Sequence, residues 1–341
     1  MAVKNKITAK DVQKKSSVDV AASAAVVPEK SKKINKIMAG ILVVVVILVC
    51  VWEFSQTTIQ DIPKLKTNLV IKLNSEIKGA GTFIPWGAAS AGPDRIIVAD
   101  NQNNRLLMFD RKGNFVKSWG TFGNKADQFH EPSGMTADDK GNAYVLDAWN
   151  SAIKGFDEKG KEITNLNLSN QGFFGPRGIG FDGNNFVIAD TGSHRIVLVG
   201  PQGNIIASRG SMGTGDDNFK GPMAVTSDEK GRYFVADTDN ARVQILDSNF
   251  KKIKFLDDFK GKVNSIAVDK EGRIYVGTDM NDSEVEVFNS NGGLLGTLVD
   301  STGSGEPFRG AKFMSITPDD LLLLTSGDAV CLYQLPVFGR K

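Results

Sequence analysis

The chain has 341 residues, 41% hydrophobic and 23% charged, so it can bury the core of one large domain or two ordinary ones and is not chiefly disordered. Its formal net charge of +2 is unevenly spread: residues 1–36 hold nine Lys and three acidic residues, and the rest holds 32 basic and 36 acidic residues, a net −4. This mildly acidic part argues against a nucleic acid as partner, because phosphate binding needs clustered Lys and Arg.

A transmembrane helix is predicted at residues 37–54, after a basic tail (1–36) that we expect to be disordered. Residues 37–52 contain no charged or strongly polar side chain, and as a helix they would span roughly 24 Å, slightly less than the ~30 Å hydrocarbon core. Lys36 can reach the aqueous boundary on one side, and Trp52 and Phe54 suit the interface on the other. We therefore expect residues 37–54 to act as a retained signal anchor in the lipid bilayer.

Three alternatives to the anchor are less favoured by the same segment. A cleaved signal peptide needs small residues at its cleavage site, which residues 51–56 (VWEFSQ) do not provide. Lipid attachment at Cys50 would need a small residue where Val49 stands. A buried helix of a globular core would be amphipathic, and residues 37–52 are apolar throughout.

The charge on either side of the anchor predicts its orientation. Nine Lys precede it, whereas Glu53, Asp61 and Lys64 are the charged residues that follow first. The positive-inside rule then places the N-terminus in the cytoplasm and the bulk of the chain outside, periplasmic or extracellular, on a single-pass protein of the cell membrane.

A repeat of about 45 residues fills the chain after a linker at 55–67. Strands ending in Asp, preceded by Ala in three of four cases, recur as residues 96–100 (IIVAD), 143–147 (AYVLD), 186–190 (FVIAD) and 233–237 (YFVAD), with degenerate copies at 274–278 and 322–326. Each copy holds four short alternating runs separated by turn residues, which predicts a four-stranded meander. A period of 40–50 residues with four strands is typical of a β-propeller.

Six copies are predicted, so the fold class is an all-β, six-bladed β-propeller of four-stranded antiparallel blades over residues 68–336, preceded by the one transmembrane helix. The copies span residues 84–130, 131–175, 176–221, 222–261, 262–310 and 311–336. The last copy ends after its third strand, and residues 68–73 (NLVIKL) supply a candidate fourth strand. Pairing the two chain ends would close the ring and remove its open edges. Residues 337–341 form a C-terminal tail.

The repeat resembles the NHL repeat in particular. Residues 98–105 (VADNQNNR), 188–195 (IADTGSHR) and 235–242 (VADTDNAR) carry the resemblance, together with the connectors 123–132 and 215–222. The similarity is strong in copies one, three and four, fair in two and weak in five and six. It implies a propeller that mediates protein interactions, as in bacterial receptor kinases that carry one outside a membrane helix. The short tail leaves no room for a kinase here.

An Asp five residues before an Arg recurs across a tight hairpin in the three best copies. The pairs are Asp100 with Arg105, Asp190 with Arg195, and Asp237 with Arg242. A ring of acidic metal ligands is one interpretation. Repetition in every good copy favours the other, a structural pairing of the carboxylate with turn amides and the Arg.

No catalytic residue, metal ligand or cofactor is assigned from the sequence. Enzymes among related propellers, such as zinc-dependent amidating lyases, lactonases and streptogramin lyases, need several His or carboxylates converging on the channel. This chain has two histidines, His130 in a connector beside Glu131 and His194 beside Arg195, where NHL repeats often carry a His; we expect His194 to be structural or solvated. The two cysteines, Cys50 and Cys331, predict no disulfide. We therefore expect no enzyme activity; an extracytoplasmic lyase or hydrolase using the channel is the alternative.

A binding face is predicted where the connectors between copies and the loops between second and third strands meet. Aligning the first strands places one residue of each copy at the channel mouth: Trp86, Ser133, Arg177, Met223, Asn264 and Phe313. Aromatic residues, Met and Arg are typical interface anchors, although the same residues could merely plug the channel. Trp149 stands at a loop tip where other copies have polar residues or Gly, and is the best single candidate. The sequence thus predicts a membrane-tethered scaffold for a protein, a peptide or another ligand.

Overall fold

The computed structural model describes residues 62–279, 285–304, 308 and 310–338. The predicted tail (1–36), the predicted membrane helix (37–54), most of the linker and the last three residues lie outside the described residues. Within the described ranges, no helix is long and apolar enough to cross a membrane.

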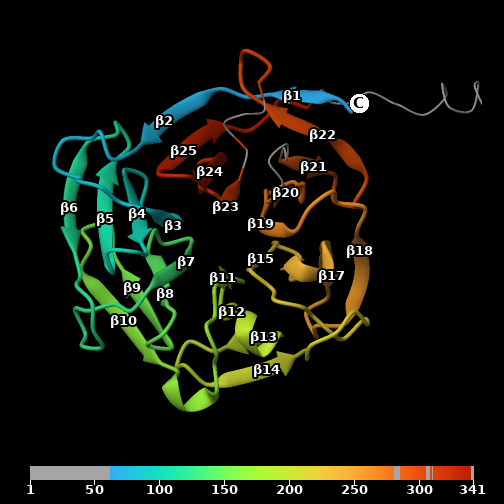
Figure 1. The fold of residues 1–341 in the computed structure, drawn as a ribbon, viewed down its shortest axis with the longest axis horizontal. Helices are drawn as coiled ribbons and strands as arrows, with labels where there is room; N and C mark the ends of the chain where they lie inside the picture. Colours follow the sequence, from blue (N-terminus) through green and yellow to red (C-terminus); the bar gives the residue numbers. More distant parts are fainter. Residues whose placement is uncertain (1–61, 280–284, 305–307, 309, 339–341) are drawn as a thin grey trace, which may run out of the picture. The chain divides into compact units, whose positions relative to one another are not determined.

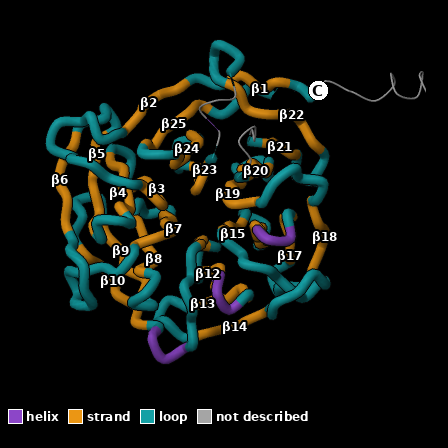
Figure 2. Tube along the Cα trace, viewed as in Figure 1, coloured by secondary structure: helices purple, strands orange, loops and turns teal. Residues whose placement is uncertain are grey.

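Six β-sheets surround a central axis, one for each expected copy (Figure 1). Within each copy the strands run antiparallel, with the first strand of the copy nearest the axis (Figure 1). Strands make up nearly all the regular structure, with three short 3-10 turns: η1 (Ser169–Gln171), η2 (Thr191–Ser193) and η3 (Thr238–Asn240) (Figure 2). The all-β, six-bladed propeller with four-stranded blades is therefore confirmed.

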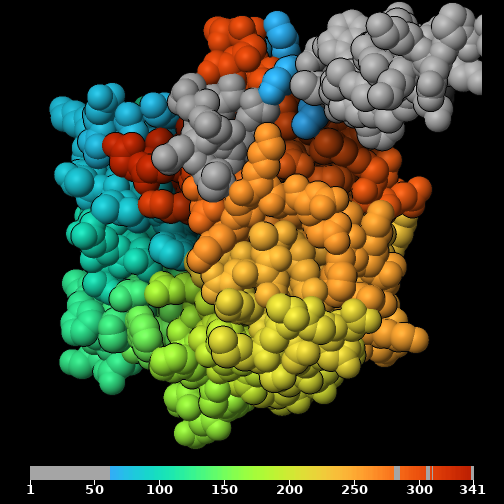
Figure 3. Space-filling view, turned by 45° about the vertical axis from the view of Figure 1, so that its right-hand side comes forward, coloured from blue at the N-terminus to red at the C-terminus, as the bar shows by residue number. Residues whose placement is uncertain are grey.

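Copies one to four each contain all the strands of one blade, whereas blades five and six also include a strand from before residue 84. Neighbouring blades meet directly at the surface (Figure 3). Blade one comprises β3 (Pro85–Ala91), β4 (Arg95–Asp100), β5 (Arg105–Asp110) and β6 (Phe115–Trp119). Blade two comprises β7 (Pro132–Ala137), β8 (Ala143–Asp147), β9 (Ala152–Phe156) and β10 (Glu162–Asn167). Blade three comprises β11 (Gly178–Phe181), β12 (Phe186–Asp190), β13 (Arg195–Val199) and β14 (Ile205–Arg209).

The second half of the ring follows the same order and includes both ends of the described chain. Blade four comprises β15 (Ala224–Ser227), β16 (Tyr233–Asp237), β17 (Arg242–Leu246) and β18 (Lys252–Leu256). Blade five comprises β19 (Val263–Val268), β20 (Ile274–Thr278), β21 (Glu286–Phe288), β22 (Leu294–Val299) and β1 (Lys64–Lys66). Blade six comprises β23 (Ala311–Ile316), β24 (Leu321–Ser326), β25 (Ala329–Gln334) and β2 (Leu69–Leu73).

The Asp and Gly residues of the repeat form the hairpin turns within the blades. The Asp138 carboxylate accepts hydrogen bonds from the backbone N–H groups of Lys140 (3.0 Å) and Asn142 (2.8 Å). Gly141 supplies the left-handed conformation (φ +81°) that closes the turn. The same carboxylate bonds recur in the turns that start at Asp110, Asp157, Asp228 and Asp247.

Glycines near the start of the inner strands let neighbouring blades approach closely. A Cβ at Gly87 would lie 2.5 Å from the carbonyl oxygen of Ser133, and one at Gly134 would lie 2.5 Å from that of Arg177. The Gly134 N–H donates to the Arg177 carbonyl at 2.9 Å, so two adjacent inner strands are hydrogen-bonded there. Small residues at these positions thus narrow the central channel.

The predicted ring closure is confirmed. β2 pairs antiparallel with β25 and becomes the outer strand of blade six. Leu73, opposite Val330, is fully buried in the core, and the Gln334 N–H donates to the Asn68 carbonyl at 3.0 Å. Both chain ends of the propeller are therefore held in one sheet, as the incomplete last copy suggested.

The predicted linker also contains a strand that the sequence did not indicate. β1 pairs in parallel with β22 and adds a fifth strand to blade five. The close approach depends on Gly296, where a Cβ would lie 2.3 Å from the Pro63 carbonyl oxygen. That carbonyl accepts a hydrogen bond from the Thr297 N–H at 2.9 Å. The structured part of the chain thus begins before residue 68.

Candidate functional site

The two edges of the ring carry different loops. We call connector face the edge that holds the connectors between blades (120–131, 168–177, 210–223 and 257–262) and the loops between second and third strands (101–104, 148–151, 191–194 and 238–241). Hydrogen bonds join these loops, for example from Asn101 Nδ2 to the Pro132 carbonyl (3.0 Å) and from the Asp239 N–H to the Lys220 carbonyl (3.0 Å). The opposite edge, the turn face, holds the tight hairpin turns.

The three repeated Asp–Arg pairs are buried ion pairs that hold the connectors. Asp100, Asp190 and Asp237 are fully buried, and the Arg Nε of each pair lies 2.7–2.8 Å from a carboxylate oxygen. The other carboxylate oxygen accepts a backbone N–H from the preceding connector, that of Ile84, Phe174 or Lys220 (2.7–3.1 Å). Each Asp thus joins a loop to its neighbouring connector, which agrees with the structural pairing of Asp and Arg that the repeat pattern favoured over a ring of metal ligands.

The predicted channel mouth brings only some of its six residues together. The Arg177 guanidinium stacks over the Trp86 ring, 4.9 Å from its centroid, and Arg177 Nη1 lies 3.2 Å from Glu131 Oε2. Ser133 is fully buried, with its hydroxyl directed at the Leu146 and Pro176 carbonyls. Phe313 is also buried and belongs to the core around blades one and six.

Burial therefore divides the six predicted residues into two groups. Trp86, Arg177, Met223 and Asn264 are partly exposed, and Ser133 and Phe313 offer no surface to a partner. The burial of Ser133 and Phe313 favours the alternative that these side chains fill the interior, because inner-strand side chains that point between blades pack in the core. Alignment within a repeat does not distinguish these positions from those at the channel.

Trp149 lies at the centre of a continuous row of aromatic side chains on the connector face. Its ring centroid is 6.2 Å from that of His130 and 6.1 Å from that of Phe174, and the Phe122 ring lies 4.9 Å from His130. Three of these side chains are well exposed: Phe122 (66%), Phe174 (61%) and Trp149 (44%). We call Phe122, His130, Trp149 and Phe174 the aromatic row.

Sequence reasoning singled out Trp149 but missed its neighbours. Phe122 and Phe174 come from two different connectors, and His130 was considered only as a weak acid–base candidate. A signal was present: Phe122 and Met212 occupy equivalent connector positions, and each is 66% exposed. An apolar residue at the same exposed point of two connectors is the kind of pattern that indicates a surface role.

A funnel opens into the central channel from the turn face. Its volume is about 370 Å³, and hydroxyls, carboxylates and apolar groups line it, among them Thr136, Asp139, Thr226, Glu229 and Ser315. Farther in, the channel narrows to a cavity of about 40 Å³ lined mainly by apolar side chains. A small molecule could enter the funnel without touching the aromatic row.

Tyrosine and aspartate side chains support the wall of this funnel. The Tyr144 hydroxyl donates to Asp138 Oδ2 at 3.0 Å. Burial, and then the neighbouring carboxylate, raise the pKa of Tyr144 to about 12, so the hydroxyl keeps its proton at neutral pH. The hydroxyl is therefore a fixed hydrogen-bond donor to Asp138, which lines the funnel.

The two histidines do not approach a cluster of metal-binding side chains. His194 Nδ1 accepts the Gly221 N–H at 2.9 Å, which joins a loop to a connector, and His130 lies in the aromatic row. Among residues 62–279, 285–304, 308 and 310–338, no three His, Cys, Asp or Glu side chains are grouped as they would be around a metal ion. In the same part of the chain, Cys331 is a buried free thiol.

Comparison with protein families gives one partial match. A family model described as a 6-bladed beta-propeller matches residues 90–186, which lie in blades one to three. No curated protein sequence matches the chain.

Comparison with solved structures finds the same fold at low sequence identity. A streptogramin B lyase is 11% identical, with 78% of this chain and 97% of that one covered and a TM-score of 0.53. A catalytically inactive virginiamycin B lyase from Staphylococcus aureus, solved with quinupristin, is 13% identical (76% and 82% covered, TM-score 0.52). A Bacteroides thetaiotaomicron protein of unknown function is 12% identical (80% and 74% covered, TM-score 0.58). At these identities the similarity extends to the fold alone: the chain carries a six-bladed β-propeller.

Proposed function

We propose that the propeller is a binding module that receives a protein or peptide partner on the connector face of blades one to three. The aromatic row supports this most directly, because four rings in contact form a continuous apolar surface across two connectors and one loop. Aromatic side chains commonly supply most of the binding energy at interfaces. The proposal assigns the propeller no catalytic step and no cofactor.

Charged groups beside the row would complete such an interface. Arg177, stacked on Trp86 and paired with Glu131, lies at the channel end of the same face. An Arg held by an aromatic ring and a carboxylate can offer its remaining N–H groups to a partner's carbonyl or carboxylate at little cost in side-chain entropy. We propose that Trp86 and Arg177 form the inner edge of the interface.

We further propose that the repeats are of the NHL type and that residues 37–54 tether the propeller to the outer side of the cell membrane. The Lys-rich segment before the apolar residues and the acidic residues after them support this orientation. A tethered binding module fits a role in which signalling or catalysis belongs to a separate partner.

Substitution of Trp149 tests the binding face. We expect Trp149→Ala to weaken partner capture from solubilised membranes by at least about 2 kcal/mol, roughly thirtyfold, with little change in melting temperature. The measurement is crosslinking of the full-length protein with quantitative mass spectrometry of the captured proteins.

Ile206→Ala is the matched control, since Ile206 is similarly exposed (52%) on the rim strand β14. A true partner is lost with Trp149→Ala and with Phe174→Ala and is kept with Ile206→Ala. If Trp149→Ala captures the same proteins as the parent, or unfolds the blade, the binding face is elsewhere.

A further inference from the structure

Blade two differs from blade four at a few positions, and these differences leave a pocket open beneath the connector of blade two. The two blades are related by a constant offset of 90 residues, so Asp147 corresponds to Asp237 and Asn150 to Asn240. Three neighbouring positions differ in kind: Ala152 replaces Arg242, Lys154 replaces Gln244, and Asn165 replaces Phe255.

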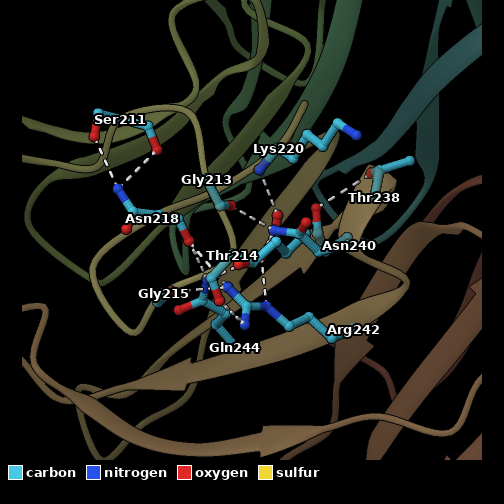
Figure 4. Close-up of polar contacts among 12 residues, drawn as sticks. Ser211, Gly213, Thr214, Gly215, Asn218, Lys220, Thr238, Asn240, Arg242 and Gln244 are labelled. Carbon is cyan, nitrogen blue, oxygen red and sulfur yellow. Dashed lines mark hydrogen bonds and ion pairs between the residues drawn. The ribbon is translucent and has the colours of Figure 1, made fainter.

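In blade four, Arg242 fills the space beneath the connector (Figure 4). Its Nε lies 2.7 Å from Asp237 Oδ2, and its Nη atoms donate to the carbonyls of Thr214, Gly215 and Asn218 (2.7–3.1 Å). Its guanidinium stacks on the Phe255 ring, 4.1 Å from the centroid. The arginine and the phenylalanine together close this part of the blade.

In blade two, Lys154 takes over the ion pair but not the space. Its Nζ lies 3.1 Å from Asp147 Oδ2 and donates to the Lys125 and Gln128 carbonyls. These carbonyls correspond to those of Gly215 and Asn218, whereas the carbonyl of Asn124, which corresponds to Thr214, receives no such bond among the described residues. Because Lys154 is buried and turned inward, the volume of the missing Arg and Phe stays open.

The open volume is a pocket of about 430 Å³ on the connector face. Trp149 forms one wall, and four amide side chains, those of Asn124, Asn150, Asn165 and Asn167, line the rest together with Lys125, Ala126, Ala152, Lys154 and Ser169. Among the described residues, the side-chain amides of Asn124 and Asn165 form no hydrogen bond with the protein, which leaves their donors and acceptors available.

The chemistry of the pocket selects against a cation and for a ligand rich in hydroxyls. No carboxylate lines it, and Lys125 adds a positive charge at its edge. The amides of Asn124 and Asn165 offer donors and an acceptor side by side, which suits neighbouring hydroxyls of a ring, and the Trp149 face suits the C–H groups of that ring. Asn150 already donates to Gly123 and Asp147, and Asn167 already accepts the Ser169 N–H. A volume of this size accommodates one or two such rings.

We propose that this pocket is a carbohydrate-binding site for a neutral sugar unit, formed because blade two lacks the Arg–Phe pair of blade four. It adds a second class of ligand to the connector face. The pocket shares Trp149 with the aromatic row, but its other lining residues lie outside the row.

The test fills the pocket with the residues that blade four already uses. The variant Ala152→Arg/Lys154→Gln/Asn165→Phe places in blade two the residues that blade four has as Arg242, Gln244 and Phe255. The new arginine replaces Lys154 as the cation paired with Asp147, so we expect the melting temperature of the variant to equal or exceed that of the parent. Binding of an N-acetylglucosamine trimer, maltotriose and a mannose trimer to the full-length protein is measured by calorimetry and saturation-transfer NMR, in a detergent without a sugar headgroup.

At least one of these sugars should bind the parent in the millimolar range or tighter, and the triple variant should bind it at least tenfold more weakly. Asn165→Phe alone, which changes an exposed side chain, should also weaken binding if the triple variant does not fold. Ile206→Ala is the matched control, since Ile206 is exposed on β14 and does not line the pocket.

Failure of all three sugars to bind would overturn the proposal, and so would binding that is equal in the parent and in the filled variants. If the sugars do not bind and the filled variants lose a captured protein instead, the pocket receives a peptide side chain, and the carbohydrate assignment is wrong. Loss of the partner with Trp149→Ala but not with the filled variants would leave the protein-binding function intact, because the filled variants keep the aromatic row and change only the pocket.

Discussion

Buried carboxylates at the ends of second strands hold the connector face together. Asp237 has the most complete set of partners, with donors from Asn240, Arg242, Gln244 and the backbone of Lys220. A fully satisfied buried carboxylate of this kind fixes the geometry of the loops around it. The buried carboxylates therefore hold in place the connector loops that carry the aromatic row and the pocket.

We expect Arg242→Ala to destabilise the protein by about 3–5 kcal/mol, because it leaves the buried Asp237 charge without its cation. Thermal and chemical unfolding measure the loss. Lys270→Ala is the control: its pair with Asp320 is about half exposed, so its removal should cost about 0–1 kcal/mol. Equal losses in the two variants would contradict a special role for the buried pair.

A second prediction concerns pH and the contact between blades three and four. Burial opposes ionisation of Asp182, but hydrogen bonds from the Asn185 N–H (2.7 Å) and the Tyr233 hydroxyl (2.8 Å) outweigh it and lower the pKa of this carboxyl. A lowered folded-state pKa contributes stability above the unfolded value of about 3.9, and this contribution is lost as pH falls through the folded value.

Asp182→Asn should therefore melt below the parent at pH 6, and the difference should shrink as the pH falls towards about 3. Melting curves of both proteins across this range measure it. Tyr233→Phe removes the inter-blade donor and should reduce the same pH-dependent difference. A gap between parent and Asp182→Asn that stays constant with pH would show that Asp182 does not titrate differently in the folded state.

At the scale of elements, the ring is closed by backbone pairing between distant segments. β2 and β25 are separated by more than 250 residues in sequence, yet they form the outer antiparallel pair of strands in blade six. β1, which precedes β2 in the chain, pairs with the outer strand β22 of blade five. These two short strands cover edges that would otherwise be open to other chains.

Deleting residues 66–75 should lower the melting temperature or cause aggregation, because it exposes the edge of β25 and removes the buried Leu73. Differential scanning calorimetry and light scattering measure these effects. The control is Val70→Ala, which changes an exposed side chain (46%) and keeps the backbone pairing. An unchanged melting curve for the deletion would show that blade six closes without β2.

At the scale of the whole molecule, the two faces of the ring offer different surfaces. The connector face carries the aromatic row and the amide-lined pocket, whereas the turn face carries the funnel into the channel. Loops on a rigid scaffold can differ between blades without changing the fold, so different ligands can be received on one face. On a repeated fold, a binding site can arise where the residues of one blade differ from those at the equivalent positions of the other blades.

The proposed topology predicts that the propeller is accessible from outside the cell. Protease added to intact cells or spheroplasts should remove the propeller and leave the N-terminal tail protected. A tag at the N-terminus, detected by immunoblotting before and after lysis, is the matched control. Full protection of the propeller in intact cells would contradict this orientation.

The sequence by itself determined the number of blades, the strand order and the closure by residues 68–73. The number of blades and the strand order depend on local patterns, such as Asp–Gly turns and alternating strands, that recur in each copy. The closure followed from the last copy, which is one strand short, together with the spare strand before the first copy. It also indicated Trp149, since an aromatic residue at a polar loop position is visible in an alignment of repeats.

Only the tertiary structure decided which side chains meet. The aromatic row joins Phe122, His130, Trp149 and Phe174 from three segments, β1 joins β22, and Ser133 and Phe313 are buried. The pocket of blade two likewise requires a comparison of packed blades, because Ala152 leaves a cavity only if no neighbour fills it. Contacts between blades depend on distances across the ring, and a periodic sequence pattern carries no direct information about them.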